Sequence, residues 1–93
     1  MSILVRFTGA PSLTAELYDS TQAKIEAAGP FPPDGLDLHV AFEAGGNFRV
    51  SEIWDSMEAF QAFGERLMPI LAESGVELAG PPEVIEIHNI IRR

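Results

Sequence analysis

The two side chains best suited to acid–base chemistry in this chain are His39 and Glu52. Gly45-Gly46 between them is typical of a hairpin turn. Strands paired about this turn would place His39 directly opposite Glu52, on one sheet face. A carboxylate beside an imidazole holds its tautomer and raises its basicity, so the pair could act as a general base near neutral pH. It could also be a cross-strand pair that only fixes sheet register, worth under about 1 kcal/mol.

Three other side chains could contact a ligand. Trp54, the only tryptophan, could stack on an aromatic molecule and donate its indole N–H, or it could anchor a core or a dimer interface. Arg6 could bind a carboxylate, phenolate or enolate, or form an internal salt bridge to Glu52 or Glu86. His88 could supply a second imidazole or be structural. The predicted catalytic residues are therefore His39 and Glu52, and the predicted substrate-binding residues are Arg6, Trp54 and His88.

Several classes of chemistry are excluded or unsupported. The chain has no cysteine, which excludes disulfides, zinc–thiolate sites, iron–sulfur clusters and a cysteine nucleophile. It contains no glycine-rich phosphate loop followed by lysine, no H-E-x-x-H and no G-x-S-x-G. Two histidines far apart in the sequence give little support for a metal site. We therefore expect neither a cofactor nor a metal.

Length and charge restrict the fold and the partners. The 93 residues make one domain with a thin core, which self-association would help. Fourteen acidic against six basic side chains give a net charge of −8, which argues against nucleic acid and anionic membranes as partners. No export signal or membrane-spanning stretch is evident, and we expect a cytoplasmic protein.

Periodicity and turn residues predict six elements in the order β-α-β-β-α-β. Strands are expected at residues 3–7, 36–43, 48–54 and 84–91, and helices are expected to start at Thr14 and at Asp55 or Ser56 and to stop at Gly29 and Gly75. Phe31, in the proline-rich stretch 30–35, is a candidate pocket lid. The order is that of an α+β ferredoxin-like fold, with an antiparallel sheet of order 4-1-3-2 and both helices on one face.

Alternation along the strands then assigns side chains to the two sheet faces. The helix-covered face is expected to hold Ile3, Val5, Phe7, Leu36, Leu38, Val40, Phe42, Ile53, Ile85 and Ile87. The opposite face is expected to hold Leu4, Arg6, Asp37, His39, Ala41, Phe48, Val50, Glu52, Trp54, Val84, Glu86, His88 and Ile90. Because a monomer would expose the apolar members of that second set, we expect a second copy of the chain to cover it and to enclose its polar groups.

The sequence also resembles a known superfamily. The run Val50-Ser51-Glu52-Ile53-Trp54-Asp55-Ser56, with Glu58-Ala59-Phe60, Phe63, Leu67-Met68-Pro69-Ile70-Leu71 and Gly75 after it, is similar to the dimeric α+β barrel superfamily. Ile3-Leu4-Val5-Arg6-Phe7, Gly35-Leu36, His39-Val40-Ala41 and His88-Asn89 fit the same group. The chain looks closest to antibiotic-biosynthesis-monooxygenase-like proteins and to small bacterial members of unassigned function. This resemblance implies a homodimer whose sheets form a barrel, each subunit with a pocket between its sheet and its helices or loops.

Two functions follow from the resemblance, and a third is disfavoured. The first is a cofactor-independent monooxygenase-like enzyme acting on a small aromatic or polyketide-like substrate. The second is a non-catalytic ligand-binding or structural homodimer. Haem-degrading relatives place a Trp, and later a His, on or just after the second helix. This chain has Phe63 near the Trp position and no later histidine before His88, so it departs from that pattern.

Overall fold

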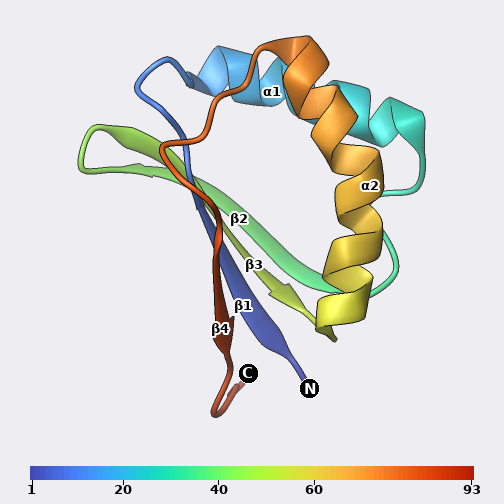
Figure 1. Cartoon of the computed structure of the whole chain (residues 1–93). Helices are drawn as coiled ribbons and strands as arrows, with labels where there is room; N and C mark the ends of the chain where they lie inside the picture. The colour runs from blue at the N-terminus through green and yellow to red at the C-terminus, as the bar shows by residue number, and fades with distance from the viewer.

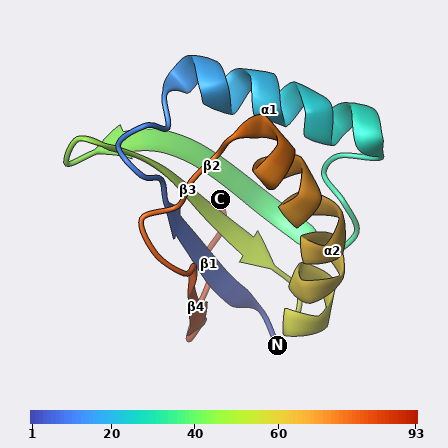
Figure 2. The same ribbon diagram turned by 45° about the horizontal axis from the view of Figure 1, so that its top comes forward.

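The computed structural model describes all residues 1–93 and forms one antiparallel sheet with two helices packed on one of its faces (Figures 1 and 2). The elements are β1 (Ile3–Thr8), α1 (Ala15–Ala28), β2 (Leu36–Ala44), β3 (Asn47–Trp54), α2 (Met57–Ser74) and β4 (Glu83–Glu86). The strand order is β2-β3-β1-β4, which is the predicted order 4-1-3-2 read from the other edge. The predicted α+β fold is therefore confirmed.

The helix ends form where the sequence predicts them. The Thr14 hydroxyl caps α1 by accepting from the Leu17 N–H at 3.1 Å. Of the two candidate caps of α2, Ser56 is the one used, and its hydroxyl accepts from the Ala59 N–H at 3.1 Å. Gly75 ends α2 in the left-handed region with φ 75°, a conformation that glycine adopts without strain. These caps determine where each helix begins and ends over the sheet.

The predicted hairpin register is confirmed except at one end. His39 lies opposite Glu52 and Leu38 lies opposite Ile53, as expected from a turn at Gly45-Gly46. The same turn also predicts Asp37 opposite Trp54. This prediction is wrong, because a bulge between Leu36 and Leu38 brings Leu36 opposite Trp54. The extra residue turns Leu36 toward the helices, where it is buried.

The face assignment is correct for β1 but wrong for most of the other strands. Ile3 and Val5 face the helices and are buried, and their partners on β3 are Trp54 and Glu52. Residues directly opposite share a face, so Trp54 and Glu52 also point toward the helices. His39, opposite Glu52, joins them on that side. The predicted location of these three side chains on the open face is therefore wrong.

The open face carries the apolar side chains that the alternation had assigned to the core. Leu38 and Val40 on β2 are 50% and 43% exposed. Phe42 and Ile85, predicted to face the helices, are also exposed. Alternation divides a strand into two faces but does not identify the covered one, and here both faces are rich in large apolar groups. The more apolar face of β2 is the one that the helices of the same chain leave uncovered.

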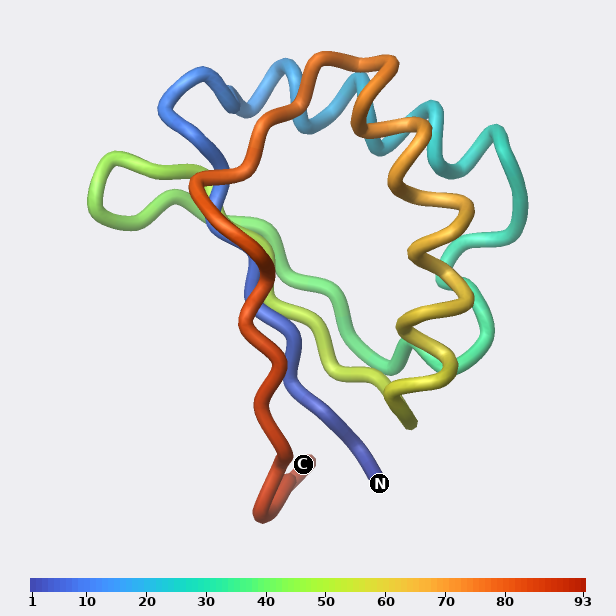
Figure 3. The backbone as a smooth tube through the Cα atoms, viewed as in Figure 1, coloured from blue at the N-terminus to red at the C-terminus, as the bar shows by residue number.

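The last strand is shorter than expected. β4 ends at Glu86, which lies opposite Ile3, the first residue of its only neighbour β1. Beyond that point no neighbouring strand remains to pair with, and the chain turns back on itself (Figure 3). The tail carries Arg92 to an ion pair with Asp37 of β2, the strand at the opposite edge of the sheet. Strand pairing over 87–91 was therefore a wrong prediction.

Candidate functional site

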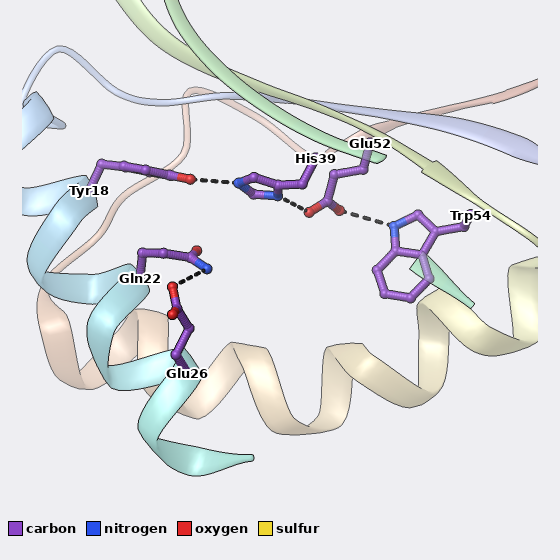
Figure 4. Close-up of polar contacts among 6 residues, drawn as sticks. All are labelled: Tyr18, Gln22, Glu26, His39, Glu52 and Trp54. Atoms are coloured by element: carbon purple, nitrogen blue, oxygen red, sulfur yellow. Dashed lines mark hydrogen bonds and ion pairs between the residues drawn. The ribbon is translucent and has the colours of Figure 1, made fainter. Parts of the chain in front are cut away.

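Four side chains from three elements form a continuous hydrogen-bonded chain between the sheet and α1 (Figure 4). Tyr18 Oη on α1 lies 2.6 Å from His39 Nε2 on β2. His39 Nδ1 lies 2.6 Å from Glu52 Oε2 on β3, and the Trp54 indole N–H donates to Glu52 Oε1 at 3.0 Å. The imidazole is thus held at both nitrogens, and the carboxylate at both oxygens.

With a neutral His39 and an ionised Glu52, the donors and acceptors in this chain fit one proton arrangement. An indole N–H only donates, and an ionised carboxylate only accepts, so Glu52 accepts from Trp54 and from His39 Nδ1–H. A neutral His39 then has its lone pair at Nε2, where the Tyr18 hydroxyl donates. Burial raises the pKa of the Tyr18 phenol, and the negative charge of Glu52 raises it further, followed by Asp19 and Glu26. Tyr18 therefore keeps its proton at neutral pH, as this arrangement requires.

The strands and helices account for these positions. Glu52 and Trp54 are two residues apart on β3 and so point to the same side. The hairpin places His39 beside Glu52, and α1 crosses above the hairpin with Tyr18 facing it. Glu52 is only 5% exposed. A buried carboxylate is tolerated when its oxygens are hydrogen-bonded, and here both are.

A cavity of about 80 Å³ lies between the sheet and the helices beside this chain. Its polar lining comes from Tyr18, Thr21, Gln22, His39 and Glu52. Its apolar lining includes Phe7, Ile25, Phe31, Phe48, Phe63 and Leu67. No lysine or arginine lines it. The position of this cavity agrees with the pocket between sheet and helices that the resemblance implies.

Aromatic rings cover the imidazole. Phe31 meets His39 edge-on with ring centroids 5.6 Å apart, and Tyr18 packs on Phe48 at 5.0 Å. The loop that carries Phe31 is held by Arg66 of α2, which donates to the Pro30 carbonyl at 3.0 Å. The predicted lid residue therefore contacts the predicted base, and the low polarity around His39 strengthens its hydrogen bonds.

The structure brings together three of the five predicted site residues. His39 and Glu52 line the cavity, while Trp54 is 0% exposed and does not line it. Trp54 lies in the core, where it packs on Phe60 and Phe63 and donates to Glu52, and its contact with a ligand stays a prediction. Its second predicted role, a core anchor, is the one the geometry supports.

Arg6 and His88 lie outside the site. Arg6 points to the open face because it alternates with Val5, which faces the helices. It pairs with Glu83 of β4 at 3.9 Å, so the predicted salt bridge to Glu52 or Glu86 is wrong. His88 is exposed and lies beyond the end of β4. Neither side chain lines the cavity, and their contacts with substrate stay predictions.

Sequence reasoning missed Tyr18 as a site residue. A tyrosine on the covered face of a helix places its hydroxyl inside the protein, where it needs a partner. His39, partly buried on the facing strand, provides one. The contact between Tyr18 and His39 was not predicted, because His39 had been assigned to the wrong face of the sheet.

The structure contains neither a candidate metal site nor a candidate membrane-spanning helix. No group of three or more histidine or carboxylate side chains is placed to hold a metal ion. Neither helix combines the length and the apolar character that crossing a bilayer requires.

Comparison with known proteins places the fold in a class. Neither a family model nor a curated protein matches the chain. Solved structures do match it over nearly its whole length. Rv0793 from Mycobacterium tuberculosis shares 20% identity with a TM-score of 0.59, and the match covers 98% of this chain and 95% of Rv0793.

Two other matches have names that mention oxygenase chemistry. SnoaB, a cofactor-independent oxygenase from Streptomyces nogalater, shares 15% identity with a TM-score of 0.62, covering 99% of this chain and 96% of its own. A candidate antibiotic biosynthesis monooxygenase from Deinococcus radiodurans shares 20% identity with a TM-score of 0.61. That match covers 100% of this chain and 98% of the Deinococcus protein. The chain thus has the α+β fold of antibiotic-biosynthesis-monooxygenase-like proteins, and the predicted resemblance is confirmed at the level of the fold.

Proposed function

We propose that this protein binds a small aromatic or polyketide-like molecule in the cavity beside Tyr18 and oxidises it as a cofactor-independent monooxygenase-like enzyme. The observation that carries the proposal is the hydrogen-bonded chain Tyr18–His39–Glu52, with distances of 2.6 Å at both links, at the wall of an apolar cavity. A fold shared with SnoaB is compatible with the proposal.

The acid–base step follows from the arrangement of protons. A substrate hydroxyl beside Tyr18 Oη gives its proton to Tyr18 while Tyr18 passes its own proton to His39 Nε2. Glu52, 2.6 Å from Nδ1, stabilises the imidazolium that forms. The product is a phenolate in an apolar site, which is electron-rich enough to react with O2. His39 and Tyr18 are the proposed catalytic residues, and Glu52 positions His39.

The oxidation balances with O2 as the only co-reactant. A ring carbon of the phenolate bonds to O2, and the imidazolium proton is returned through Tyr18 to the distal oxygen. The resulting hydroperoxide breaks its O–O bond and loses water. One oxygen atom stays on the ring as a quinone carbonyl, and the other leaves as water with the hydrogens of the ring carbon and of the phenol. His39 and Tyr18 end the cycle as they began it.

Oxygen uptake with 1-naphthol and phenol as probes tests this function. We expect uptake above the protein-free rate with the wild type, and a fall of about 100-fold or more in His39→Ala, the usual contribution of a general base. His88→Ala is the matched control, since it removes the other histidine, which is exposed and away from the cavity. Equal rates in wild type and His39→Ala would remove His39 as the base.

A non-catalytic binding protein is the second candidate. Both nitrogens of His39 and both oxygens of Glu52 are already bonded within the chain, so the set could serve the fold alone. In that case the probes would bind without any oxygen uptake above background.

We also propose that the protein forms a homodimer through the open sheet face. Support comes from the exposed Leu38, Val40, Phe42 and Ile85 on that face. A contiguous apolar patch of this kind marks an interface more often than a free surface. The cavity lies on the other side of the sheet, so the dimer would stabilise the sheet rather than complete the site.

A further inference from the structure

Arg66 of α2 joins the end of α1 to the loop that follows it. Its Nη2 donates to the Ile25 carbonyl at 2.8 Å, and its Nη1 donates to the Pro30 carbonyl at 3.0 Å. Ile25 lies in the last turn of α1, where a helix presents carbonyls that lack a partner within it. That turn contains no basic residue of its own, so Arg66 supplies from α2 the positive charge that the end of a helix favours.

Two neighbours define the space in which the guanidinium lies. A Cβ built on Gly29 would lie 3.0 Å from Arg66 Nη1 and 3.1 Å from its Cζ. Gly29 has an extended backbone with φ 164°, which any residue can adopt, so what it provides here is room for Arg66. On its other contact the guanidinium lies over the Phe63 ring, 5.1 Å from the centroid.

The loop bound by Arg66 carries Phe31 to the imidazole. Phe31 directly follows Pro30, and its ring packs on Phe63 with centroids 6.3 Å apart. The same ring meets His39 at 5.6 Å. Phe31 lines the cavity, whereas Arg66 does not. Arg66 therefore reaches a cavity residue indirectly, through the backbone of the residue before it and through the ring beside it.

Arg66 provides the only hydrogen bond that holds this part of the loop. Residues 30–32 make no backbone–backbone hydrogen bond, and the next one along the chain runs from the Leu36 N–H to the Pro33 carbonyl. Pro30 and Pro32 have no N–H to donate. Within the chain, the bond from Arg66 to the Pro30 carbonyl is thus the one hydrogen bond of residues 30–32. A segment with so few bonds opens easily when one of them is removed.

From these contacts we propose that Arg66 is a positioning residue of the site, which keeps the Phe31 ring against His39 and so keeps water away from the imidazole. A less hydrated imidazole bonds more strongly to Tyr18 and Glu52. The inference rests on the function proposed above only for its effect on turnover. The position of Phe31 can be measured in the ligand-free protein.

The ¹H NMR signals of the His39 ring report the position of Phe31, because an aromatic ring shifts the resonances of nearby protons. His88 is the only other histidine and is exposed, so its signals serve as an internal reference. Phe31→Leu measures the shift that the ring causes. We expect Arg66→Met to move the His39 signals by at least about half of that shift, in the same direction. In the Phe31→Leu background, Arg66→Met should move them no further.

Arg49→Met is the matched control. Arg49 also donates to a loop carbonyl, that of Ala44 at 3.0 Å, but it does not line the cavity. It should leave the His39 signals in place. Arg66→Lys keeps the charge but replaces the two-pronged guanidinium with a single ammonium group, so its shift should be smaller than that of Arg66→Met.

Gly29→Ala tests the same contact with the arginine present. The added Cβ crowds Nη1 and Cζ without straining the backbone, so it should displace the guanidinium and move the His39 signals in the direction seen for Phe31→Leu. This variant gives the answer should Arg66→Met fail to fold.

Turnover gives a separate measurement. With phenol as the probe, kcat/KM for oxygen uptake should fall by about tenfold in Arg66→Met and in Phe31→Leu, and the double variant should be no slower than the slower single variant. A loss that multiplies in the double variant would mean that Arg66 acts by another route, and would overturn the inference.

The remaining outcomes are equally distinct. The inference is overturned by His39 signals that stay in place in Phe31→Leu, or in both Arg66→Met and Gly29→Ala, and by an equal shift in Arg49→Met. If the signals move as expected but the wild type takes up no oxygen, Arg66 remains the residue that positions Phe31 and the oxygenase proposal fails. Oxygen uptake with unmoved signals has the opposite meaning.

Discussion

Single residues determine the proton arrangement of the site. Glu52 is the group on which this arrangement depends, because it accepts from Trp54 and His39 and so places the imidazole proton on Nδ1. Nε2 is then free to take a proton from Tyr18. The basicity proposed for His39 thus depends on a carboxylate that does not itself need to touch the substrate.

Glu52→Gln should reverse the tautomer of His39. The glutamine oxygen can still accept from Trp54, but its amide would then donate to Nδ1 and move the imidazole proton to Nε2. We expect ¹⁵N chemical shifts to show the Nδ1–H tautomer in the wild type and the Nε2–H tautomer in the variant. Oxygen uptake should fall to the level of His39→Ala.

Glu86→Gln provides the control, because Glu86 is an exposed carboxylate on β4. An Nδ1–H tautomer that persists in Glu52→Gln would contradict the proton arrangement derived from the distances.

Tyr18 provides a direct pH measurement because it is the only tyrosine. Burial, then Glu52, Asp19 and Glu26, raise its pKa above the ordinary value of 10.0. The phenolate absorbance of the folded protein should therefore titrate above pH 10.0, and that of the urea-unfolded protein near it. Coinciding titrations would show that the phenol is not buried as described.

The raised pKa of Tyr18 also determines whether stability rises or falls with pH. A pKa that is higher in the folded state means that the contribution of Tyr18 is fully present below pH 10.0 and is lost as pH rises through the folded pKa. Urea unfolding should show the wild type losing stability in this alkaline range more steeply than Tyr18→Phe.

At the level of elements, α2 contains two residues that weaken it. Pro69 lies inside the helix and cannot donate a hydrogen bond to the Glu65 carbonyl. Gly64 is also inside the helix, and an added Cβ there would meet no atom within 4 Å. The helix is continuous from Met57 to Ser74 despite both residues, because its apolar side chains pack on the sheet and on α1.

Pro69→Ala should stabilise the protein. Pro69 is exposed, so little packing is lost, and the gain is about 1–3 kcal/mol after allowing for the greater entropy of the unfolded chain. Gly64→Ala should add a smaller gain of about 0.5–1 kcal/mol. Urea denaturation measures both changes. A loss of stability in Pro69→Ala would show that the packing of α2 depends on the proline.

At the scale of the whole molecule, the proposed homodimer depends on the open sheet face. The cavity and the hydrogen-bonded chain lie on the helix side, and the exposed apolar side chains lie on the other. The two surfaces are separated by the thickness of the sheet. Assembly and ligand binding should therefore be separable by mutation.

Val40→Lys should produce a monomer. A lysine in the middle of the open face would bury its charge in the proposed interface, which is strongly unfavourable. Analytical ultracentrifugation should show about twice 10.1 kDa for the wild type and 10.1 kDa for the variant. Met68→Lys is the control, since Met68 is 58% exposed on α2. A monomeric wild type would overturn the homodimer, and loss of phenol-dependent oxygen uptake in Val40→Lys would contradict the separation of the two surfaces.

Local patterns in the sequence were enough to predict the element order, the helix caps and the hairpin register. Thr14, Ser56 and Gly75 act through bonds to residues close by in the sequence, and Gly45-Gly46 sets the pairing of His39 with Glu52. Each of these features depends on contacts that a short stretch of chain makes with itself. The element order together with right-handed crossovers extended them to the right sheet order.

Only the tertiary structure decided which face of the hairpin the helices cover. Alternation with a period of two defines two faces without identifying the covered one, and both faces here are apolar enough to be buried. The choice depends on contacts between α1, α2 and the sheet, which are distant in the sequence. It is this choice that brings Tyr18 to His39, buries Trp54 and removes Arg6 from the site. The pairing of His39 with Glu52 could therefore be predicted from the sequence. The cavity beside the pair and the contact of His39 with Tyr18 could be recognised only in the tertiary structure.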